Sequence, residues 1–528
     1  MAGSVSLSRR SLLRLGVGAA CAAGLAGPGI CGGSQPAPTS TRPTVFAGGP
    51  KKGGTLRAAQ LYDITPRQPH SISENNQMFY AQLMDTVVYF DHDMKPQPGL
   101  AESWEFSKDY KTLTLKLRKG VKFHSGRELE ANDVLRNIKN TMDPQAGSQM
   151  GGQARLIAEM QTPDKYTVIL ALKQPSPSFL DIFETLYIFD MDSIADVTSG
   201  KRVVGTGPFQ WGEWRPGESF TAKRFDGFWK GPVPLDGFEI QVAKDAQSVL
   251  VSLESGAIDL AVNPLEKEIP RLKQNKDLAV LISESGNQWY YLSANVAAKP
   301  TDNKLVRQGI NYAINRQRLV ETILGGVGEA TCSPWPKGSK AFDAEAGKRY
   351  TYNLDKAKAL FREAKLVEGA EIVIQPTSAH PAMVSLAEML NADLAKIGIK
   401  LKVETLDRTT WYAKLQGKQF THLWTGAMGF MNMDPTTPML QAFPVRVGNN
   451  ASNYTDPRHK QLVDAAVVEI DPAKRKDLFK QLTDLLLDEC FCMPVTPNKR
   501  AWGTRAYVKG LDHSAYDRVL LDKVWLDK

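Results

Sequence analysis

The stretch PGLAESWEFSKDYKTLTLKLRKGVKFHSGRELEANDV, residues 98–134, carries the clearest structural signal in this chain of 528 residues. Apolar residues alternate at Leu113, Leu115 and Leu117 and again at Val121 and Phe123, which is the period of a half-buried β-strand. Turn-forming residues separate these runs at 107–111, 119–120 and 125–126. After residue 127 apolar side chains recur at 134, 138 and 142, a helical spacing. The stretch therefore predicts a short antiparallel meander that leads into a helix.

The same residues carry a resemblance to a known family. LAESW (100–104), LRKGVKFHSG (117–126) and the helix start ANDV (131–134) resemble the signature of extracytoplasmic solute-binding proteins of family 5, the peptide/nickel-type group that serves ABC importers. One departure is Glu130, which stands where the family usually has a Thr or Asn suited to capping the helix. Glutamate caps poorly, so we expect other contacts to support this helix start.

Further fragments extend the resemblance, in the family's order, over nearly all of the mature chain. They are KKGGTLR (51–57), VGTGPF (204–209), WRPG (214–217), FDGFW (225–229), LESGAID (253–259) and VRQGINYAINR (306–316). The resemblance implies an α/β fold of the two-lobed periplasmic-binding-protein type, class II in its large three-domain variant, with a central cleft and a hinge. Ligand binding would close the lobes and produce a conformation that the importer recognises.

The resemblance also implies domain boundaries. Residues 51–88, 199–288 and 494–528 would form the N-terminal lobe (domain I), residues 89–198 an extra domain of that lobe (domain II), and residues 289–493 the C-terminal lobe (domain III). Length is consistent with this division, because 528 residues are too many for one hydrophobic core and predict two to four domains.

The N-terminus predicts export. SRRSLLR (8–14) precedes an apolar run that ends near residue 27, as in a twin-arginine signal peptide over residues 1–31. A chance Arg pair ahead of an ordinary Sec leader is the alternative. Cys31 is followed by a Gly/Pro/Ser/Thr-rich segment, 32–50, which we expect to be a disordered tether. Ile30 departs from the small residue that lipobox cleavage requires, so lipidation at Cys31 and release of an unmodified protein both stay open.

Charge and hydropathy give no support to a nucleic-acid-binding protein or to a membrane-spanning fold. The net charge of +8 falls to +5 without the leader, because residues 1–31 contain Arg9, Arg10 and Arg14 and no acidic residue. So small a charge, spread along the chain, gives no argument for nucleic acid as a partner. No other run reaches the roughly 18 apolar residues that a membrane span requires.

No motif for catalysis, a cofactor or a metal is present. The seven histidines are scattered without metal-ligand spacing and are expected to be structural or on the surface: His70, His92, His124, His380, His422, His459 and His513. Cys332, Cys490 and Cys492 lack a zinc or C-x-x-C spacing and are expected to be buried small residues. GGVG (325–328) lacks the Lys-Ser/Thr of a phosphate loop. We therefore expect a protein that is not an enzyme and needs no cofactor.

Aromatic residues at the start of the implied C-terminal lobe indicate a binding site. Trp289, Tyr290 and Tyr291 stand on a strand, and Asn295 follows in what resembles the family's aromatic-to-Asn segment. Aromatic faces bury area at low entropic cost and suit a pocket that encloses a ligand. Because side chains alternate along a strand, only one subset can face a cleft, and core packing is the alternative for each ring.

The segment WYAKLQGKQFTHLWTGAMGFMNMDP, 411–435, resembles the part of the family that selects the ligand. In peptide-binding members a D-Y-x-D/E-P-like motif follows a strand, and its first Asp pairs with the α-amino group of the peptide. Matching Asp434 and Pro435 to the end of that motif places Met431 at the first Asp. A thioether cannot neutralise an ammonium, which weakens the case for a peptide. Nickel-type relatives carry a His after Asp-Pro, whereas Thr436 stands here.

Ten residues are therefore expected to contact ligand: Trp289, Tyr291, Asn295, Trp411, Trp424, Met428, Phe430, Met431, Asn432 and Asp434. The methionines and Phe430 would form an adaptable apolar wall, and plain core packing is the alternative.

We expect an exported, monomeric receptor on the periplasmic or cell-surface side of the membrane. It would deliver a small organic solute, in first place an oligopeptide or peptide-like compound, to an ABC permease and ATPase. A receptor for an oligosaccharide, an opine-like compound or a metal chelate is the alternative within this class. An exported enzyme and a surface lipoprotein that binds nothing small are alternatives from other classes.

Periodicity outside these motifs predicts strands at 166–171, 238–242 and 278–282 and helices at 78–84, 246–253, 303–323, 383–397 and 473–487. That mixture favours α/β or α+β lobes.

Overall fold

The computed structural model describes residues 49–528 except 68–69, 71–75, 147, 149, 285, 367–369 and 432. The predicted twin-arginine leader, Cys31 and nearly all of the predicted tether lie outside the described residues.

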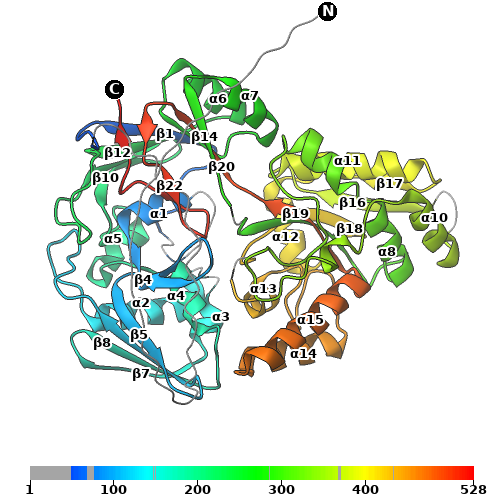
Figure 1. Ribbon diagram of the computed structural model, residues 1–528, viewed down its shortest axis with the longest axis horizontal. Helices are drawn as coiled ribbons and strands as arrows, with labels where there is room; N and C mark the ends of the chain where they lie inside the picture. Colours follow the sequence, from blue (N-terminus) through cyan, green and yellow to red (C-terminus); the bar gives the residue numbers. More distant parts are fainter. Residues whose placement is uncertain are drawn as a thin grey trace, which may run out of the picture. The chain divides into compact units, whose positions relative to one another are not determined.

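A seven-stranded mixed sheet with the order β10-β11-β12-β1-β13-β20-β14 belongs to the N-terminal lobe (Figure 1). Its strands are β1 (Thr55–Gln60), β10 (Phe209–Arg215), β11 (Ser219–Arg224), β12 (Gly237–Val242), β13 (Leu260–Val262), β14 (Leu278–Ile282) and β20 (Ala501–Arg505). β1 runs parallel to both β12 and β13, whereas β20 is antiparallel to β13 and β14. Helices α1 (Gln77–Leu83), α6 (Ala246–Ser255) and α7 (Ile269–Gln274) share buried cores with this sheet.

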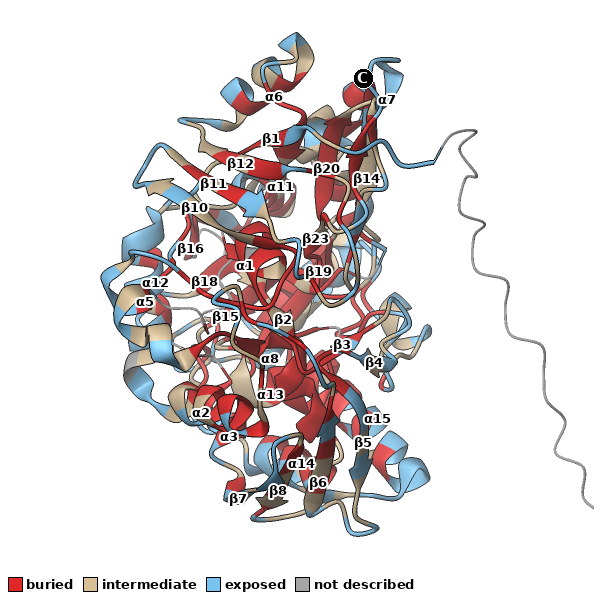
Figure 2. Cartoon of the chain, turned by 90° about the vertical axis from the view of Figure 1, so that its left-hand side faces the viewer, coloured by how far each residue is buried: buried red, intermediate tan, exposed pale blue. Residues whose placement is uncertain are grey.

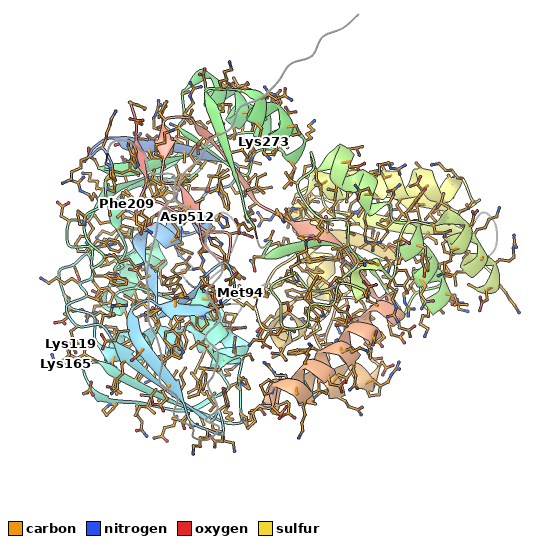
Figure 3. The ribbon with its side chains drawn as sticks, viewed as in Figure 1. Met94, Lys119, Lys165, Phe209, Lys273 and Asp512 are labelled. Carbon is orange, nitrogen blue, oxygen red and sulfur yellow. The ribbon has the colours of Figure 1, made fainter. Side chains whose placement is uncertain are left out.

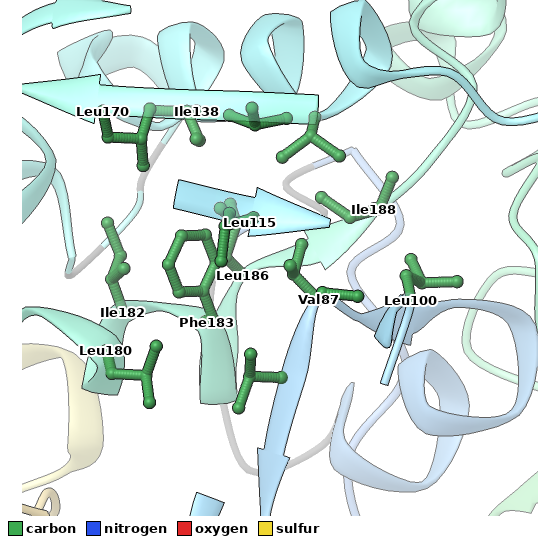
Figure 4. Close-up of a cluster of buried hydrophobic side chains, with 14 of the residues drawn as sticks. Val87, Leu100, Leu115, Ile138, Leu170, Leu180, Ile182, Phe183, Leu186 and Ile188 are labelled. Carbon is green, nitrogen blue, oxygen red and sulfur yellow. The ribbon is translucent and has the colours of Figure 1, made fainter. Parts of the chain in front are cut away.

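The meander predicted from residues 98–134 is part of a four-stranded antiparallel sheet with the order β5-β6-β8-β7. These strands are β5 (Ala101–Phe106), β6 (Thr112–Leu117), β7 (Ile157–Asp164) and β8 (Thr167–Leu172), and helix α2 (Ala131–Met142) accompanies them. Leu115 and Leu170 on neighbouring strands pack with Ile138 of α2 in one buried core (Figure 4). The change from strand to helix is confirmed. Residues 121–123 make only an isolated bridge, between Lys122 and Glu128, because turns at both ends leave too few residues for a strand.

Other contacts do support the start of α2, as Glu130 led us to expect. The carboxylate of Asp133 accepts the backbone N–H of Glu130 at 2.9 Å, and Arg127 holds that carboxylate with bonds of 2.9 and 2.8 Å. The N–H of Ala131 donates to the carbonyl of Lys165 at 2.7 Å. Two otherwise orphaned backbone donors are thereby satisfied.

A five-stranded sheet with the order β17-β16-β18-β15-β19 belongs to the C-terminal lobe. Its strands are β15 (Gln288–Ala294), β16 (Glu371–Pro376), β17 (Lys400–Val403), β18 (Leu423–Met428) and β19 (Cys492–Asn498). One face packs on α8 (Lys304–Ala313), α10 (Leu354–Glu363) and α11 (Pro381–Ala395); the other packs on α12 (Arg408–Gly417), α13 (Thr436–Gln441), α14 (Pro457–Val468) and α15 (Pro472–Glu489). Alternate residues of β15 therefore enter two different cores.

The chain passes between the large sheets twice, from β14 to β15 and from β19 to β20. The strands of these sheets are largely buried, while the helices around them keep exposed faces (Figure 2). Short elements complete the described chain: β2 (Asp85–Thr86), β3 (Val88–Phe90), β4 (Pro96–Pro98), α3 (Gly151–Ala154), α4 (Ile182–Thr185), β9 (Tyr187–Ile188), α5 (Ile194–Ser199), β21 (Val508–Lys509), β22 (Asp512–His513), β23 (Val519–Leu520) and β24 (Trp525–Leu526). The boundaries given above for the three domains stay predictions.

One predicted helix is divided. Residues 303–323 form α8, which ends at Ala313, then α9 (Arg316–Arg318) and a π-helical turn (Leu319–Ile323). Asn315 causes the break, because its side chain accepts the N–H of Arg318 at 3.0 Å and so starts a new helix. The other predicted helices and strands are confirmed within two residues at most ends.

The prediction that the cysteines are buried is confirmed. The three described cysteines are free thiols and all are buried. Cys490 ends α15 in a left-handed conformation, with φ of 50°, and only Cys492 lies on β19.

Candidate ligand-binding cavity

A cavity of about 370 Å³, which we call cavity A, lies at the carboxyl ends of four strands. Most lining residues stand at or just after the ends of β1, β12, β13 and β16, and others belong to the connection from β19 to β20. They are residues 60–62, 244–246, 262–266, 378–381 and 498–501, together with Tyr290. Loops diverge at the carboxyl ends of parallel strands, which is why α/β sheets bind ligands there. Both lobes contribute to this lining, so a ligand in cavity A would contact both.

A smaller cavity of about 40 Å³, cavity B, shares Tyr62, Ala379 and His380 with cavity A. It adds Arg408, Trp411 and Tyr412 from α12. The guanidinium of Arg408 lies over the rings of Tyr62, at 5.1 Å, and Tyr412, at 5.7 Å. Since Tyr62 follows β1 and Arg408 begins α12, this cation–π contact joins the two lobes.

Local hydrogen bonds position the lining of cavity A. The amide nitrogen of Gln60 donates to the carbonyl of Tyr62 at 2.7 Å. Asp245 accepts the N–H and the hydroxyl of Ser248, both at 2.8 Å, at the start of α6. The hydroxyl of Tyr290 donates to Glu266 at 3.1 Å. Both carboxylates of the described lining therefore already have partners within the protein.

Lys244 and Lys499 of cavity A and Arg408 of cavity B are cations placed differently from these carboxylates. Lys244 and Arg408 are exposed and Lys499 is half-buried. Among the residues that the structure describes, none forms an ion pair with Lys244, Lys499 or Arg408. Because the two carboxylates beside them are committed locally, the described lining presents positive charge to a ligand. A carboxylate is the group that such a lining can bind through charge-assisted hydrogen bonds.

His380 and three buried histidines differ in their surroundings. His380 lines both cavities, and its ring centroid lies 5.8 Å from that of Tyr290. Burial lowers the pKa of His70, His124 and His459 to about 4, so these three rings are neutral at physiological pH. His380 is thus the histidine whose position makes it a candidate ligand contact.

Two of the predicted contacts, Trp411 and Tyr291, meet at one glycine, and a third, Trp424, is buried in the same core. A Cβ atom on Gly426 would lie 2.6 Å from the ring of Trp411 and 2.9 Å from the hydroxyl of Tyr291, so the close packing requires glycine. Trp424 stacks on Phe420 at 4.5 Å and is fully buried, and burial raises the pKa of Tyr291 well above its ordinary value. Trp411 alone of these three lines cavity B. Ligand contact by Tyr291 and Trp424 stays a prediction, and their side chains pack in the C-terminal core.

Trp289 lies away from cavities A and B. It lines a third cavity of about 390 Å³, cavity C, together with His92, Trp335 and Phe342. Its neighbour Tyr290 lines cavity A, because successive side chains of β15 point to opposite faces.

Asn295 has a local structural role in the described contacts. Its amide nitrogen donates to the carbonyl of Phe420 at 2.9 Å, and its amide oxygen accepts from the side chain of Asn453 at 2.9 Å. The oxygen also accepts the N–H of Ala297 at 3.1 Å. These bonds hold the turn after β15.

The methionine segment is buried rather than open. Met428, Phe430 and Met431 are 6%, 7% and 1% exposed. The N–H of Met431 donates to the carbonyl of Asn287 at 3.2 Å, while Phe430 and Met433 join the core of the four-stranded sheet. Asn432 lies outside the described residues. The segment therefore packs between the lobes, and its contact with ligand stays a prediction.

Asp434 is bound by a protein cation. Arg475 donates two hydrogen bonds to its carboxylate, at 2.6 and 2.8 Å, and both residues are buried. A carboxylate held in this bidentate way is not available to neutralise a ligand ammonium.

Sequence reasoning missed Tyr62, His380, Arg408 and Lys499. They belong to four segments that no motif connects, so nothing in the sequence brings them together. The one usable signal was position: Lys244, which also lines the cavity, follows shortly after the strand predicted at 238–242.

None of the described helices is both long and apolar enough to cross a membrane. Within the described part of the chain, no group of three or more His, Cys, Asp or Glu side chains is arranged to hold a metal ion.

Relatives with known names align over most of this chain. The dipeptide-binding protein of Escherichia coli (strain K12) is 30% identical over 449 residues, which are 78% of this chain and 83% of the relative. The glutathione-binding protein GsiB of Shigella flexneri serotype 5b (strain 8401) is 28% identical over 85% of this chain and 88% of its own.

Solved structures share the fold. The periplasmic binding protein DppA from Helicobacter pylori, in complex with the peptide STSA, superimposes with a TM-score of 0.78 at 24% identity, covering 90% of this chain and 99% of that one. The binding protein AgaA from A.tumefacien R10, in complex with agropinic acid, gives 0.76 at 23% identity over 88% and 98%. The prediction of a two-lobed α/β binding-protein fold is confirmed.

A match to a family model shows to which family the chain belongs. Residues 95–450 match the model described as bacterial extracellular solute-binding proteins, family 5 Middle, which spans more than half of the chain. With the relative at 30% identity, this match establishes what the motifs of residues 98–134 predict: the chain belongs to family 5 of the bacterial extracellular solute-binding proteins.

Proposed function

We propose that this chain is an exported, monomeric receptor of an ABC importer and that it binds a short peptide or peptide-like solute in cavity A. The observation that carries the proposal is the lining of cavity A, which comes from strand ends of both lobes. A ligand held there stabilises the closed arrangement of the lobes, which a permease and ATPase complex can recognise. The volume of about 370 Å³ suits a small organic ligand.

The names of relatives support the peptide class. They include a dipeptide-binding protein, a di/tripeptide-binding protein and a glutathione-binding protein. Turnover of the ligand is no part of the proposal, because members of this family are described as solute-binding proteins. Export by a twin-arginine leader, with or without a lipid on Cys31, belongs to the same proposal.

The receptor recognises a carboxylate of its ligand more strongly than an ammonium. Lys244, Lys499 and Arg408 present positive charge at cavities A and B. Met431, at the place of the family's ammonium-binding Asp, is 1% exposed and has no charge. Burying an ammonium without a counter-charge costs several kcal/mol, so a carboxylate-bearing peptide fits better than a basic one.

Isothermal calorimetry on the mature protein tests both the peptide class of the ligand and the preference for a carboxylate. The panel holds neutral, acidic and basic dipeptides and tripeptides, each with a free or an amidated C-terminus. We expect acidic peptides with a free C-terminus to bind most tightly. Lys499→Ala should weaken that binding about 10- to 100-fold, the value of a charged hydrogen bond. The matched control Lys273→Ala, on α7 (Figure 3), should leave it unchanged. Absence of binding to every peptide would refute the peptide class.

A carboxylated non-peptide ligand is the second candidate, and the lack of an ammonium partner at Met431 favours it. AgaA is solved with agropinic acid, and NikA from Staphylococcus aureus with Ni(L-His)2. An opine and a nickel–histidine chelate therefore join the panel. Tight binding of either one, together with no binding of peptides, would select this candidate.

A further inference from the structure

The lobes also meet at Asp181, away from cavities A and B. Asp181 ends a short helical turn, Phe179–Asp181, next to the core of the four-stranded sheet. Its Oδ2 atom accepts the N–H of Asp434 at 2.8 Å and the hydroxyl of Thr437 at 3.0 Å. Both donors lie at the start of α13 in the C-terminal lobe. One carboxyl group therefore bridges the two lobes.

Apolar contacts accompany this bridge. Phe430 and Met433, which precede α13, are buried in the same core as Phe179 and Leu180. The hydroxyls of Thr436 and Ser178 lie 3.3 Å apart beside them. The contact at Asp181 is thus a packed interface and not an isolated hydrogen bond.

A second carboxyl group shares the site. Asp434 receives two hydrogen bonds from Arg475, at 2.6 and 2.8 Å, and one from the hydroxyl of Thr436 at 2.8 Å. Arg475 also donates to the carbonyl of Ala466 at 2.9 Å. Asp181, Asp434 and Arg475 are 7%, 6% and 5% exposed.

The charges at this interface do not balance when both carboxyl groups are ionised. Arg475 supplies the one buried positive charge among the described contacts, and it is bound to Asp434. Lys340 reaches Asp434 at 3.7 Å, but its side chain is 70% exposed, so water screens most of its charge. Glu184, on α4, is paired with Arg518 at 3.1 Å. Burial and the neighbouring charge of Asp434 raise the pKa of Asp181 to about 7.

We propose that Asp181 is a proton-controlled latch, which holds the lobes together at α13 when it is protonated and releases them when it ionises. Opening the interface returns Asp181 to water, where a carboxyl group ionises near pH 4. The closed form therefore binds the proton more tightly than the open form. Between about pH 4 and pH 7 the closed-to-open ratio must fall as the pH rises, by up to about tenfold per pH unit. Such a receptor closes more readily on the acid side of neutrality.

Small-angle scattering on the mature, ligand-free protein tests the latch. The wild type is expected to have a smaller radius of gyration at pH 5.5 than at pH 7.5. Asp181→Asn is expected to be compact at both values, because its amide is neutral at every pH and its oxygen can accept both hydrogen bonds. The control Asp226→Asn changes a carboxylate that is 85% exposed, and it should follow the wild type.

Two outcomes would overturn the proposal: a wild type whose radius of gyration is the same at both pH values, or an Asp181→Asn variant with the wild-type response. Thr437→Val provides a second test if the Asp181→Asn variant fails to fold. It removes one donor without touching a charge, so it should be less compact than the wild type at pH 5.5 and still respond to pH. A Thr437→Val protein as compact as the wild type would count against the latch.

Discussion

The guanidinium carbon of Arg408 lies 5.1 Å from the centroid of the Tyr62 ring, and this contact joins the loop after β1 to the first residue of α12. Tyr412, one turn further along α12, flanks the same guanidinium at 5.7 Å. The two rings are 39% and 44% exposed at cavity B. The rim of the proposed ligand site is therefore held by a cation between aromatic rings of both lobes.

A double-mutant cycle on Arg408 and Tyr62 should show coupling. Each of Arg408→Ala and Tyr62→Leu removes the cation–π contact that favours closure, so each should weaken ligand binding by about two- to fivefold. The double variant should lose less than the sum of the two, with a coupling of about 0.5–1 kcal/mol by calorimetry. Arg362→Ala, on α10, is the control and should bind as the wild type does. Strictly additive losses would show that the contact does not serve binding.

The buried ion pair of Asp434 and Arg475 should be a large element of stability. Arg475→Met leaves the Asp434 carboxylate buried without its counter-charge, so the free energy of unfolding should fall by about 3–5 kcal/mol. Arg458→Met, which breaks an exposed pair with Asp456, should cost no more than about 1 kcal/mol. Urea unfolding followed by circular dichroism measures both values. Equal losses in the two variants would contradict the role given to Asp434.

Chemical blocking of a peptide ligand distinguishes the contributions of its amino and carboxyl termini to the affinity. Acetylation of its amino group should change the affinity less than about threefold, because Met431 supplies no charge to the ammonium. Amidation of its C-terminus should weaken binding about tenfold or more, since a charged hydrogen bond to Lys499 or Lys244 is lost. Calorimetry with the four matched peptides gives the comparison. If only the acetylated peptides lost affinity, the cleft would contain an ammonium site. The inference that Met431 leaves the ligand ammonium without a counter-charge would then be wrong.

Acid should destabilise the fold through buried His124. Its Nδ1 atom accepts the N–H of Gly205 at 3.2 Å, and its Nε2 atom lies 3.1 Å from the carbonyl of Gly207. Burial lowers its pKa to about 4, whereas the unfolded chain takes up the proton near pH 6.5. The stability that the neutral ring contributes is therefore complete above about pH 6.5 and is lost as the pH falls from there towards 4, by at most about 3 kcal/mol.

Comparison of the wild type with His124→Gln isolates this effect. The difference in unfolding free energy between pH 7.5 and pH 4.5 should be smaller in the variant, because glutamine does not titrate. Urea titrations at the two pH values provide the measurement. An identical pH dependence in both proteins would mean that His124 is protonated in the native state.

The fold was predictable from local patterns, whereas the cavity was not. The alternation at Leu113, Leu115 and Leu117 decides a strand by itself, and β6 follows it. Tyr62, His380 and Lys499 meet only because separate strands of two sheets end at one place, and no local pattern encodes that meeting. Aromatic composition does not distinguish a cavity wall from a core, and Trp424 and Tyr291, whose contact with ligand stays a prediction, pack in the C-terminal core.

The pairing of buried charges was equally unpredictable from the sequence. The motif drew attention to Asp434, and only the structure shows that its carboxylate is held by Arg475 and that its backbone N–H bonds to Asp181. Asp181 is separated from Asp434 by 253 positions and Arg475 from Asp434 by 41, and each one alone is an ordinary polar residue.

The most direct test of the central claim is a crystal structure of the mature protein with the tightest ligand from the calorimetric panel. We expect the ligand in cavity A, in contact with Tyr62 and His380, with a carboxylate within hydrogen-bond distance of Lys499 or Lys244. A ligand bound in cavity C beside Trp289 and Trp335, or an ammonium group seated against Met431, would contradict it.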